Sequence, residues 1–368
     1  MVCSYIRLKN YRNIDTALVC FDPSLNILIG NNAEGKTNLL EAVYTFALGK
    51  SFRGTKEADV IKFGEDVSSF EIGFYTEKRS DEQTLKLILS KGKKRQAFLN
   101  GVKIDRITEM IGIFRAVLFC PEHLSLIKEG PSMRRNYLDV AISQFRPVYL
   151  KSLKRYYAIL EQRNKLIKSA EEDRRNVSET IFLWSHQLAK EAALISAFRS
   201  EYVKKAGDAV RAYFSEMTGG KELTEMKYIG SAKMPSDEYF NKEETEKRYI
   251  SLLTENVDRE IGAGSTLWGI HKDDIDIMIN GKSARFFASQ GQQRSLALAM
   301  KLAEGDICFS ETGDRPALLL DDVLSELDTK RRSFLLSNVK DRQVIITSCE
   351  KIDTENAKII NVEGGRYS

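Results

Sequence analysis

Residues 30–37 read GNNAEGKT, which fits the pattern G-x-x-x-x-G-K-[ST] at every fixed position. In this pattern the glycines let backbone N–H groups curve around phosphates, and the lysine reaches the β and γ phosphates. The helix that follows adds a favourable dipole. The motif therefore predicts an ATP site formed by Gly30, Asn31, Asn32, Ala33, Glu34, Gly35, Lys36, Thr37 and Asn38.

A second acidic motif is expected wherever a phosphate loop binds Mg²⁺. Residues 317–322 read ALLLDD, an apolar run typical of a buried strand that ends in two carboxylates. Asp321 and the Thr37 hydroxyl are the predicted Mg²⁺ ligands, and Asp322 would orient or deprotonate the attacking water. Lys36 and Asp322 are thus the candidate catalytic residues. The alternative is that the two aspartates only cap the next helix.

The segment SQGQQR (289–294) places a glycine turn at the start of a small-residue helix. A helix N-terminus with free amides is an anion-binding device, so Ser289, Gly291 and Gln292 are candidate phosphate contacts. The phosphate loop of the same chain already binds that phosphate from one side. The segment resembles the signature motif of ABC-type ATPases, and this resemblance implies that the turn acts on the nucleotide of a second copy of the chain.

The elements that position these motifs form an α/β pattern. The apolar run 25–30 predicts a buried strand before the phosphate loop, and residues 38–49 have helical spacing. The pairs Asn100-Gly101 and Asn280-Gly281 predict hairpin turns, because both residues of each pair tolerate positive φ.

Between Pro147 and about Gly219 the sequence predicts two long helices joined by a polar turn at 171–178. The predicted apolar stripe on the first is Leu150, Leu153, Tyr157, Leu160, Asn164 and Ile167, which suits a short antiparallel helical hairpin. We predict an α/β fold in which a P-loop ATPase lobe of the ABC type, with mixed sheets and helices, is built from residues 1–120 and 269–368. A mainly helical lobe is inserted at 121–268.

Taken together, these stretches resemble the RecF family of ABC- and SMC-type head ATPases. The resemblance rests on GNNAEGKTNLLEAVY, PEHLSLIKEGPSMRRNYLD, GIHKDDI with FASQGQQRSLALA, and LLLDDVLSELD, and it extends over nearly the whole chain. It implies an ATP-dependent homodimer in which SQGQQR is the signature motif and Ser325–Asp328 the D-loop. In similar heads, residues at the positions of Arg12 and Asn13 lie near the base and α-phosphate; the alternative for both is a solvated strand end.

The resemblance further implies function. Members of the family bind double-stranded and gapped DNA, act in replication and recombinational repair, and help RecO and RecR to load RecA. They hydrolyse ATP slowly. The sequence departs from ABC ATPases at three places. Val117 or Leu118 stands where a Mg²⁺-binding glutamine is usual, with Glu122 as a possible substitute, Asp322 stands in place of a longer glutamate, and Thr347 and Ser348 occupy the position of the switch histidine. The shorter carboxylate and the missing histidine suit slow hydrolysis.

Other function classes fit less well. The ATPase subunit of an ABC transporter would need a shorter helical lobe and normally a switch histidine. A structural head of an SMC tether would need hundreds of coiled-coil residues, and a P-loop kinase would leave SQGQQR without a role. The segment His271–Asp274 is predicted to contact DNA or a partner subunit, or to form an exposed turn.

The composition of the chain limits how it could bind DNA and where in the cell it could act. The 368 residues carry a net charge of only +4, so DNA contact must come from local basic clusters. Five scattered cysteines without a CxxC pair, and no apolar run of membrane-spanning length, indicate a cytoplasmic protein. The DNA binding that the resemblance implies would associate it with the nucleoid. The candidate DNA contacts are Arg53, Lys56, Lys93, Lys94 and Arg95, with a further basic row on the first long helix at Lys151, Lys154, Arg155, Arg163, Lys165 and Lys168.

Overall fold

A computed structural model describes residues 1–54, 57–171, 174–350 and 357–368. The chain divides into two compact units, one made of residues 1–125 with 294–368 and the other of residues 126–293. The second boundary falls inside helix α8 (Gln290–Thr312). Residues 269–293, which the sequence assigned to the ATPase lobe, therefore pack with the inserted unit, because β10 (Asp274–Ile279) pairs with β9 (Thr224–Ile229) there.

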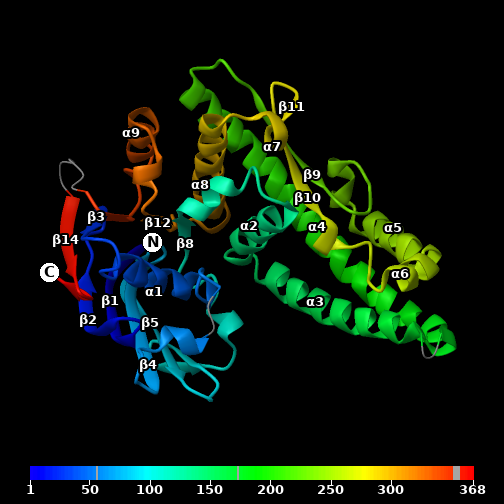
Figure 1. Cartoon of the computed structure of the whole chain (residues 1–368), viewed down its shortest axis with the longest axis horizontal. Helices are drawn as coiled ribbons and strands as arrows, with labels where there is room; N and C mark the ends of the chain where they lie inside the picture. The colour runs from blue at the N-terminus through cyan, green and yellow to red at the C-terminus, as the bar shows by residue number, and fades with distance from the viewer. Residues whose placement is uncertain (55–56, 172–173, 351–356) are drawn as a thin grey trace. The chain divides into compact units, whose positions relative to one another are not determined.

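The first unit contains two six-stranded sheets (Figure 1). One is antiparallel, in the order β2 (Ile14–Cys20), β1 (Val2–Tyr11), β4 (Val67–Thr76), β5 (Arg79–Ser90), β6 (Gln96–Leu99) and β7 (Val102–Ile104). The other is mainly parallel, in the order β15 (Arg366–Tyr367), β14 (Ala357–Glu363), β3 (Leu25–Ile29), β13 (Val344–Ser348), β12 (Ala317–Asp321) and β8 (Ala116–Phe119). In that second sheet only β15 runs antiparallel to its neighbour.

Helix α1 (Lys36–Leu48) joins both sheets into a single core. Ten of its 13 residues are buried, which leaves it almost no solvent face. Its apolar side chains pack with Phe70 of the antiparallel sheet and with Leu319 and Ile345 of the parallel sheet. Since α1 begins at Lys36, this packing fixes the start of the helix at the edge where β3, β12 and β13 end. The same unit contains α9 (Thr329–Ser337) and most of α8.

The inserted unit is mainly helical. It contains α2 (Pro131–Ser143), α3 (Pro147–Lys168), α4 (Arg174–Thr218), α5 (Lys242–Glu255), α6 (Val257–Ala263) and α7 (Ala284–Phe287), with a small sheet in the order β11 (Lys282–Ser283), β10 and β9. Figure 1 shows α3 and α4 side by side, as the predicted helical hairpin requires. Short 3₁₀ turns follow several helices, including Ser169–Glu171.

Both predicted hairpin turns are confirmed. Asn100 and Gly101 have φ of 49° and 79°, and Asn280 and Gly281 have φ of 48° and 75°. Leu99 pairs with Val102 across the first turn. The Asn-Gly pairs take positive φ as a type I′ turn requires, so local sequence alone determined these two corners.

The predicted stripe on α3 is correct at Leu160 and Ile167 and is displaced by one position at its other four residues. Its buried residues are Tyr149, Ser152, Tyr156, Leu160, Arg163 and Ile167, while Tyr157 is 42% exposed. The helix buries this face because Arg163 lies in contact with Glu260, with 2.5 Å between Nη2 and Oε2, and neither residue is exposed. Apolar spacing could not reveal a stripe held partly by charge, and Arg163 is thereby excluded as a surface DNA contact.

The prediction that His271–Asp274 could form an exposed turn holds only in part. Asp273 is fully buried and accepts hydrogen bonds from Arg199 and Tyr228. His271 contacts the Tyr156 hydroxyl through Nδ1 at 2.6 Å. His271 and Asp273 are therefore packed within the inserted unit, whereas Lys272 is exposed, and contact of this segment with DNA or a partner subunit stays a prediction.

Candidate functional site

The phosphate loop follows β3 and contains residues with positive φ. Gly35 has φ of 113° and Ala33 has φ of 67°, both in the left-handed region. At Gly30 the constraint is space, because a Cβ there would lie 2.2 Å from the Val362 carbonyl oxygen of β14. Only glycine fits such a close approach between two strands.

Lys36 is 6% exposed and its ammonium rests on the loop. Nζ donates to the carbonyl oxygens of Gly30 and Asn31, each at 2.7 Å, and lies 3.5 Å from the Cys349 sulfur. No described carboxylate pairs with it. A cation held only by neutral acceptors can exchange them for phosphate oxygens, which bind it more strongly.

A carboxylate and two hydroxyls meet at the ends of β12 and β13. Thr37 Oγ1 and Thr347 Oγ1 both donate to Asp321 Oδ1, at 2.8 and 2.9 Å. Burial raises the pKa of Asp321, and the two hydroxyl hydrogen bonds oppose that shift. Thr347, one of the residues at the switch position, thus orients Asp321.

These oxygens fit Mg²⁺ in their chemistry. Carboxylate and hydroxyl oxygens are the hard ligands that the ion prefers, and it usually keeps waters and substrate phosphates as its other ligands. Within the described residues no group of three or more His, Cys, Asp or Glu side chains could hold a metal ion. Thr37 and Asp321 are the residues that would hold the ion, with phosphates and water as its other ligands.

Asp322 follows in a strained conformation. Its φ is 51°, which is uncommon for a residue with a Cβ. The Thr347 hydroxyl accepts from the Asp322 amide at 2.9 Å, and Ser325 Oγ donates to the Asp322 carbonyl at 2.7 Å. Strain of this kind persists where surrounding contacts impose it, frequently at functional sites. The Asp322 side chain lines the pocket as a result.

A pocket of about 330 Å³ gathers the predicted residues. Its lining contains Asn13, Asn32, Ala33, Gly35, Lys36, Thr37, Asn38, Arg53, Asp322, Thr347 and Cys349. Gly30, Asn31 and Glu34 lie in the same loop beside it. The Glu34 carbonyl accepts from the Gly365 amide at 2.9 Å, which ties the loop to the chain's last hairpin.

Arg12 is held away from the rim of this pocket by a buried carboxylate. Its guanidinium donates to both oxygens of Glu41, at 2.8 and 2.5 Å, and Glu41 is fully buried on α1. Arg53 lies 3.9 Å from the same carboxylate and donates to Asn38 Oδ1 at 3.0 Å. Asn38 in turn donates to Asn13 Oδ1 at 2.8 Å.

Sequence reasoning missed Glu41 and Cys349. Glu41 stands among apolar residues in NLLEAVYTFAL, and a lone acid on the buried part of a helix was the available signal. Cys349 directly follows the strand that ends in Thr347 and Ser348. Its sulfur lies 2.9 Å from Asn32 Oδ1, at the mouth of the pocket.

The signature segment forms its own helix cap. Gln292 N donates to Ser289 Oγ at 3.2 Å, and Ser289 N donates to Gln292 Oε1 at 2.7 Å. This reciprocal pair is a capping box at the start of α8, with Gly291 in the first turn. Ser289 itself is exposed. The hydroxyl that was predicted to bind phosphate thus accepts a hydrogen bond from its own helix in the single chain.

The segment predicted as a D-loop also caps a helix. Asp328 accepts from Arg331 N at 2.9 Å at the start of α9. Arg294 lies 3.1 Å from Glu326, which links the start of α8 to this loop within the first unit.

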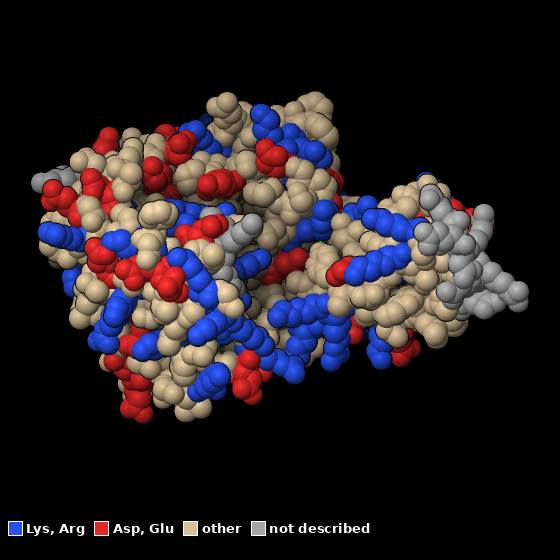
Figure 2. Space-filling model, turned by 60° about the horizontal axis from the view of Figure 1, so that its bottom comes forward, with Lys and Arg blue, Asp and Glu red and all other residues tan. Residues whose placement is uncertain are grey.

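The candidate DNA contacts fall in different places. Arg53 lines the nucleotide pocket, and Arg95 donates to the Gly49 carbonyl. Lys93 and Lys94 are exposed in the turn between β5 and β6, and Lys56 lies outside the described residues. In Figure 2 Lys and Arg on the visible face are interspersed with Asp and Glu.

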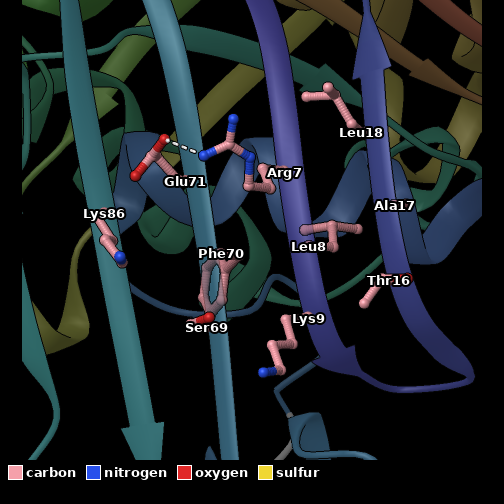
Figure 3. A pocket seen from close by; sticks show the side chains of 10 residues that line it. All are labelled: Arg7, Leu8, Lys9, Thr16, Ala17, Leu18, Ser69, Phe70, Glu71 and Lys86. Carbon is pink, nitrogen blue, oxygen red and sulfur yellow. Dashed lines mark ion pairs between the residues drawn. The ribbon is translucent and has the colours of Figure 1, made fainter.

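A second hollow, of about 410 Å³, lies on the antiparallel sheet (Figure 3). Arg7 on β1 points toward Glu71 on β4, and their charged atoms are 3.6 Å apart. Lys9 and Lys86 also line it. It contains none of the residues predicted to bind nucleotide, so the chemistry of the sequence motifs belongs to the smaller pocket.

Comparison with known proteins now decides the family. The profile described as "RecF/RecN/SMC N terminal domain" matches residues 2–363. The "DNA replication and repair protein RecF" of Acetivibrio thermocellus is 37% identical over 371 residues, covering 100% of this chain and 99% of the relative. The chain belongs to the RecF family. The protein of the same description from Shouchella clausii is 39% identical over 350 residues, with 95% and 92% covered.

Solved structures agree with the RecF assignment. The structure of "the recombination mediator protein RecF-ATPrS in RecFOR pathway" has a TM-score of 0.94 and 32% identity, covering 99% of this chain and 97% of that one. Its counterpart described as RecF-ATP has a TM-score of 0.92 at the same identity. An Smc head bound to the C-winged helix domain of ScpA has a TM-score of 0.59 at 16% identity and so shares the fold alone. The predicted α/β head fold is confirmed.

Proposed function

We propose that this chain is an ATP-dependent DNA-binding protein of replication and recombinational repair. The observation that supports it most is the pocket in which Lys36, Thr37 and Asp322 meet, in a chain that resembles a RecF-ATP structure along its whole length. Mg²⁺ would be bound by Thr37 and Asp321, and Lys36 would contact the β and γ phosphates. The charge of Mg²⁺ would neutralise the charge that develops on the phosphates.

The signature segment supports a dimeric mechanism. Ser289, Gly291 and Gln292 would bind the γ-phosphate of a second copy. Ser289 Oγ and the helix amides would then donate to phosphate oxygens in place of the present capping hydrogen bonds. Asp322 would orient the attacking water. The Asp322 side chain is shorter than the glutamate of ABC transporters, and Thr347 occupies the position of the switch histidine. Hydrolysis would therefore be slow and would time the release of DNA.

The proposed partners are double-stranded and gapped DNA, a second copy of the chain, and RecR together with RecO. The name of the pathway in the similar structures supports RecO and RecR. Lys93 and Lys94 are available to neutralise phosphates because both are exposed. Family membership supports a place in the cytoplasm, with association to the nucleoid through DNA. No described helix has the length and apolar character needed to cross a membrane. The full-length match to RecF relatives does not favour the transporter alternative.

Sedimentation velocity with and without ATP and Mg²⁺ tests the mechanism. We expect a monomer without nucleotide and a dimer with it. Ser289→Arg should block the dimer while the monomer still binds ATP, because Ser289 belongs to a different compact unit from the pocket. A wild type that stays monomeric at every ATP concentration would overturn the dimeric mechanism.

DNA binding provides the second measurement. Affinity for a short duplex should rise with ATP and fall steeply with salt, since phosphate contacts release counterions. Lys36→Met should remove the ATP dependence. Equal affinity with ATP, with ADP and without nucleotide would contradict the proposed switch.

A further inference from the structure

An acidic residue of the inserted unit lies against the signature segment. Gln292 Nε2 donates to Glu222 Oε1. Gln292 has one amide oxygen and one NH₂ group, and its oxygen already accepts from the Ser289 amide. A carboxylate can only accept, so Glu222 determines which way the Gln292 amide points. Glu222, Gln292 and Ser289 thus form one continuous chain of hydrogen bonds.

The backbone fixes Glu222 in this position. Helix α4 ends at Thr218, and Gly219 and Gly220 follow with φ of 67° and 75°, which reverses the chain. On the other side, Leu223 forms two hydrogen bonds with Asn280. The Leu223 amide donates to Asn280 Oδ1 at 2.9 Å, and the Asn280 amide donates to the Leu223 carbonyl at 2.9 Å. Glu222 is therefore held between a left-handed turn and the β10–β11 hairpin.

The charge of Glu222 is unmatched in the described part of the chain. No described lysine or arginine forms an ion pair with it, although its side chain is only partly exposed. The same helix start, with its positive dipole end, is where a γ-phosphate would bind. Two negative groups would then face the same short segment.

We propose that Glu222 opposes ATP-dependent dimerisation: its carboxylate holds Gln292 in the self-capped arrangement and repels the γ-phosphate that a second copy delivers. The inference rests on the proposed function of the signature segment and adds its regulation. Dimers form only when the contacts to the nucleotide outweigh this repulsion. Glu222 therefore raises the protein concentration at which the ATP-bound chain dimerises.

Glu222→Gln separates charge from hydrogen bonding, because the new amide oxygen still accepts from Gln292. We expect the dissociation constant of the ATP-bound dimer, measured by sedimentation velocity at low salt, to fall about fivefold. The gain should shrink at high salt as screening increases. Glu222→Lys should lower the constant further. ATP affinity of the monomer should stay unchanged in both variants.

Glu225→Gln is the matched control. Glu225 lies on β9, is 57% exposed and pairs with Lys227 at 3.5 Å, so its replacement should leave dimerisation unchanged. A purely structural role for Glu222 would leave the glutamine variant neutral and make the lysine variant weaker, and either result overturns the proposal. If wild type and variants all remain monomeric with ATP, both the proposed function and this inference fail. If they dimerise equally, only the role of Glu222 fails.

Discussion

Buried charges serve opposite purposes in the inserted unit and in the nucleotide pocket of the first unit. In the inserted unit Arg199 is fully buried, and its guanidinium donates to the Ile270 carbonyl at 2.7 Å, to Asp273 at 3.2 Å, to Asp139 at 2.8 Å and to the Tyr149 hydroxyl at 3.1 Å. Each of its nitrogens has a partner. Arg163 is matched in the same way by Glu260, Thr266 and Ser185.

The nucleotide pocket of the first unit uses charges differently. Lys36 contacts two backbone carbonyls, and Asp321 accepts from two hydroxyls. Neither has an opposite charge as partner among the described residues. Burial of an ion without a counter-ion is costly, and it leaves the group ready for a ligand that supplies one. Internal pairing therefore distinguishes charges that stabilise a unit from charges that serve its chemistry.

The largest expected effect comes from breaking the paired cluster. Arg199→Met leaves Asp273 and Asp139 buried without their cation, so the free energy of unfolding should fall by about 3–5 kcal/mol. Urea denaturation measures this. Arg155→Ala, which removes a 70% exposed partner of Glu191, should cost less than about 0.5 kcal/mol. Equal effects of the two variants would contradict the comparison.

Removing the unpaired cation should affect binding rather than stability. Lys36→Ala loses charge-assisted hydrogen bonds to phosphate, so ATP affinity should fall about 100-fold, or about 2.7 kcal/mol. Calorimetric titration measures the affinity, and the thermal unfolding midpoint should stay close to wild type. The exposed Lys9→Ala serves as control. A large loss of stability in Lys36→Ala would show that the lysine has a structural role.

A neutral histidine in the inserted unit gives a pH-dependent effect. Burial lowers the pKa of His271 to about 4, against 6.5 when unfolded. Because the pKa of His271 is lower in the folded state, neutral His271 contributes to the free energy of unfolding above about pH 6.5. This contribution is lost as pH falls toward 4, by about 2–3 kcal/mol. Unfolding measured at pH 7 and pH 4.5 should therefore show a smaller loss for His271→Gln than for wild type. The same pH dependence in both would refute the assignment.

The smallest expected effect is a gain in stability. Burial raises the folded pKa of Asp321, so its contribution to stability is present below about pH 3.8 and lost as pH rises through the folded pKa. At pH 7 the charged carboxylate therefore destabilises the nucleotide-free protein. Asp321→Asn should stabilise it by about 1 kcal/mol and should abolish the effect of Mg²⁺ on ATP binding. The exposed Glu363→Gln should change neither quantity.

Local chemistry made much of the first unit predictable. The phosphate loop, the strand that ends in Asp321 and Asp322, and the two Asn-Gly turns each depend on residues close in sequence. The backbone conformation that they require is encoded in the residue types themselves. The family resemblance then predicted the α/β head fold, which the similar solved structures confirm.

The inserted unit was less predictable, and Arg163 and Asp273 show why. Both are charged, so their types predict surface positions, yet both are fully buried. Their partners lie far away in sequence, Glu260 for the first and Arg199 for the second. The free-energy cost of burying either charge is offset only when the fold brings its oppositely charged partner into contact with it.

The sequence by itself therefore determined the phosphate loop, the acidic strand end, the hairpin corners and the family. Only the tertiary structure decided that Glu41 binds Arg12, that Ser289 and Gln292 cap their own helix, and that Glu222 contacts the signature segment. The physical reason is the range of the interactions. Backbone conformation depends on adjacent residues, whereas the partner of a buried charge depends on which distant segments the fold brings into contact.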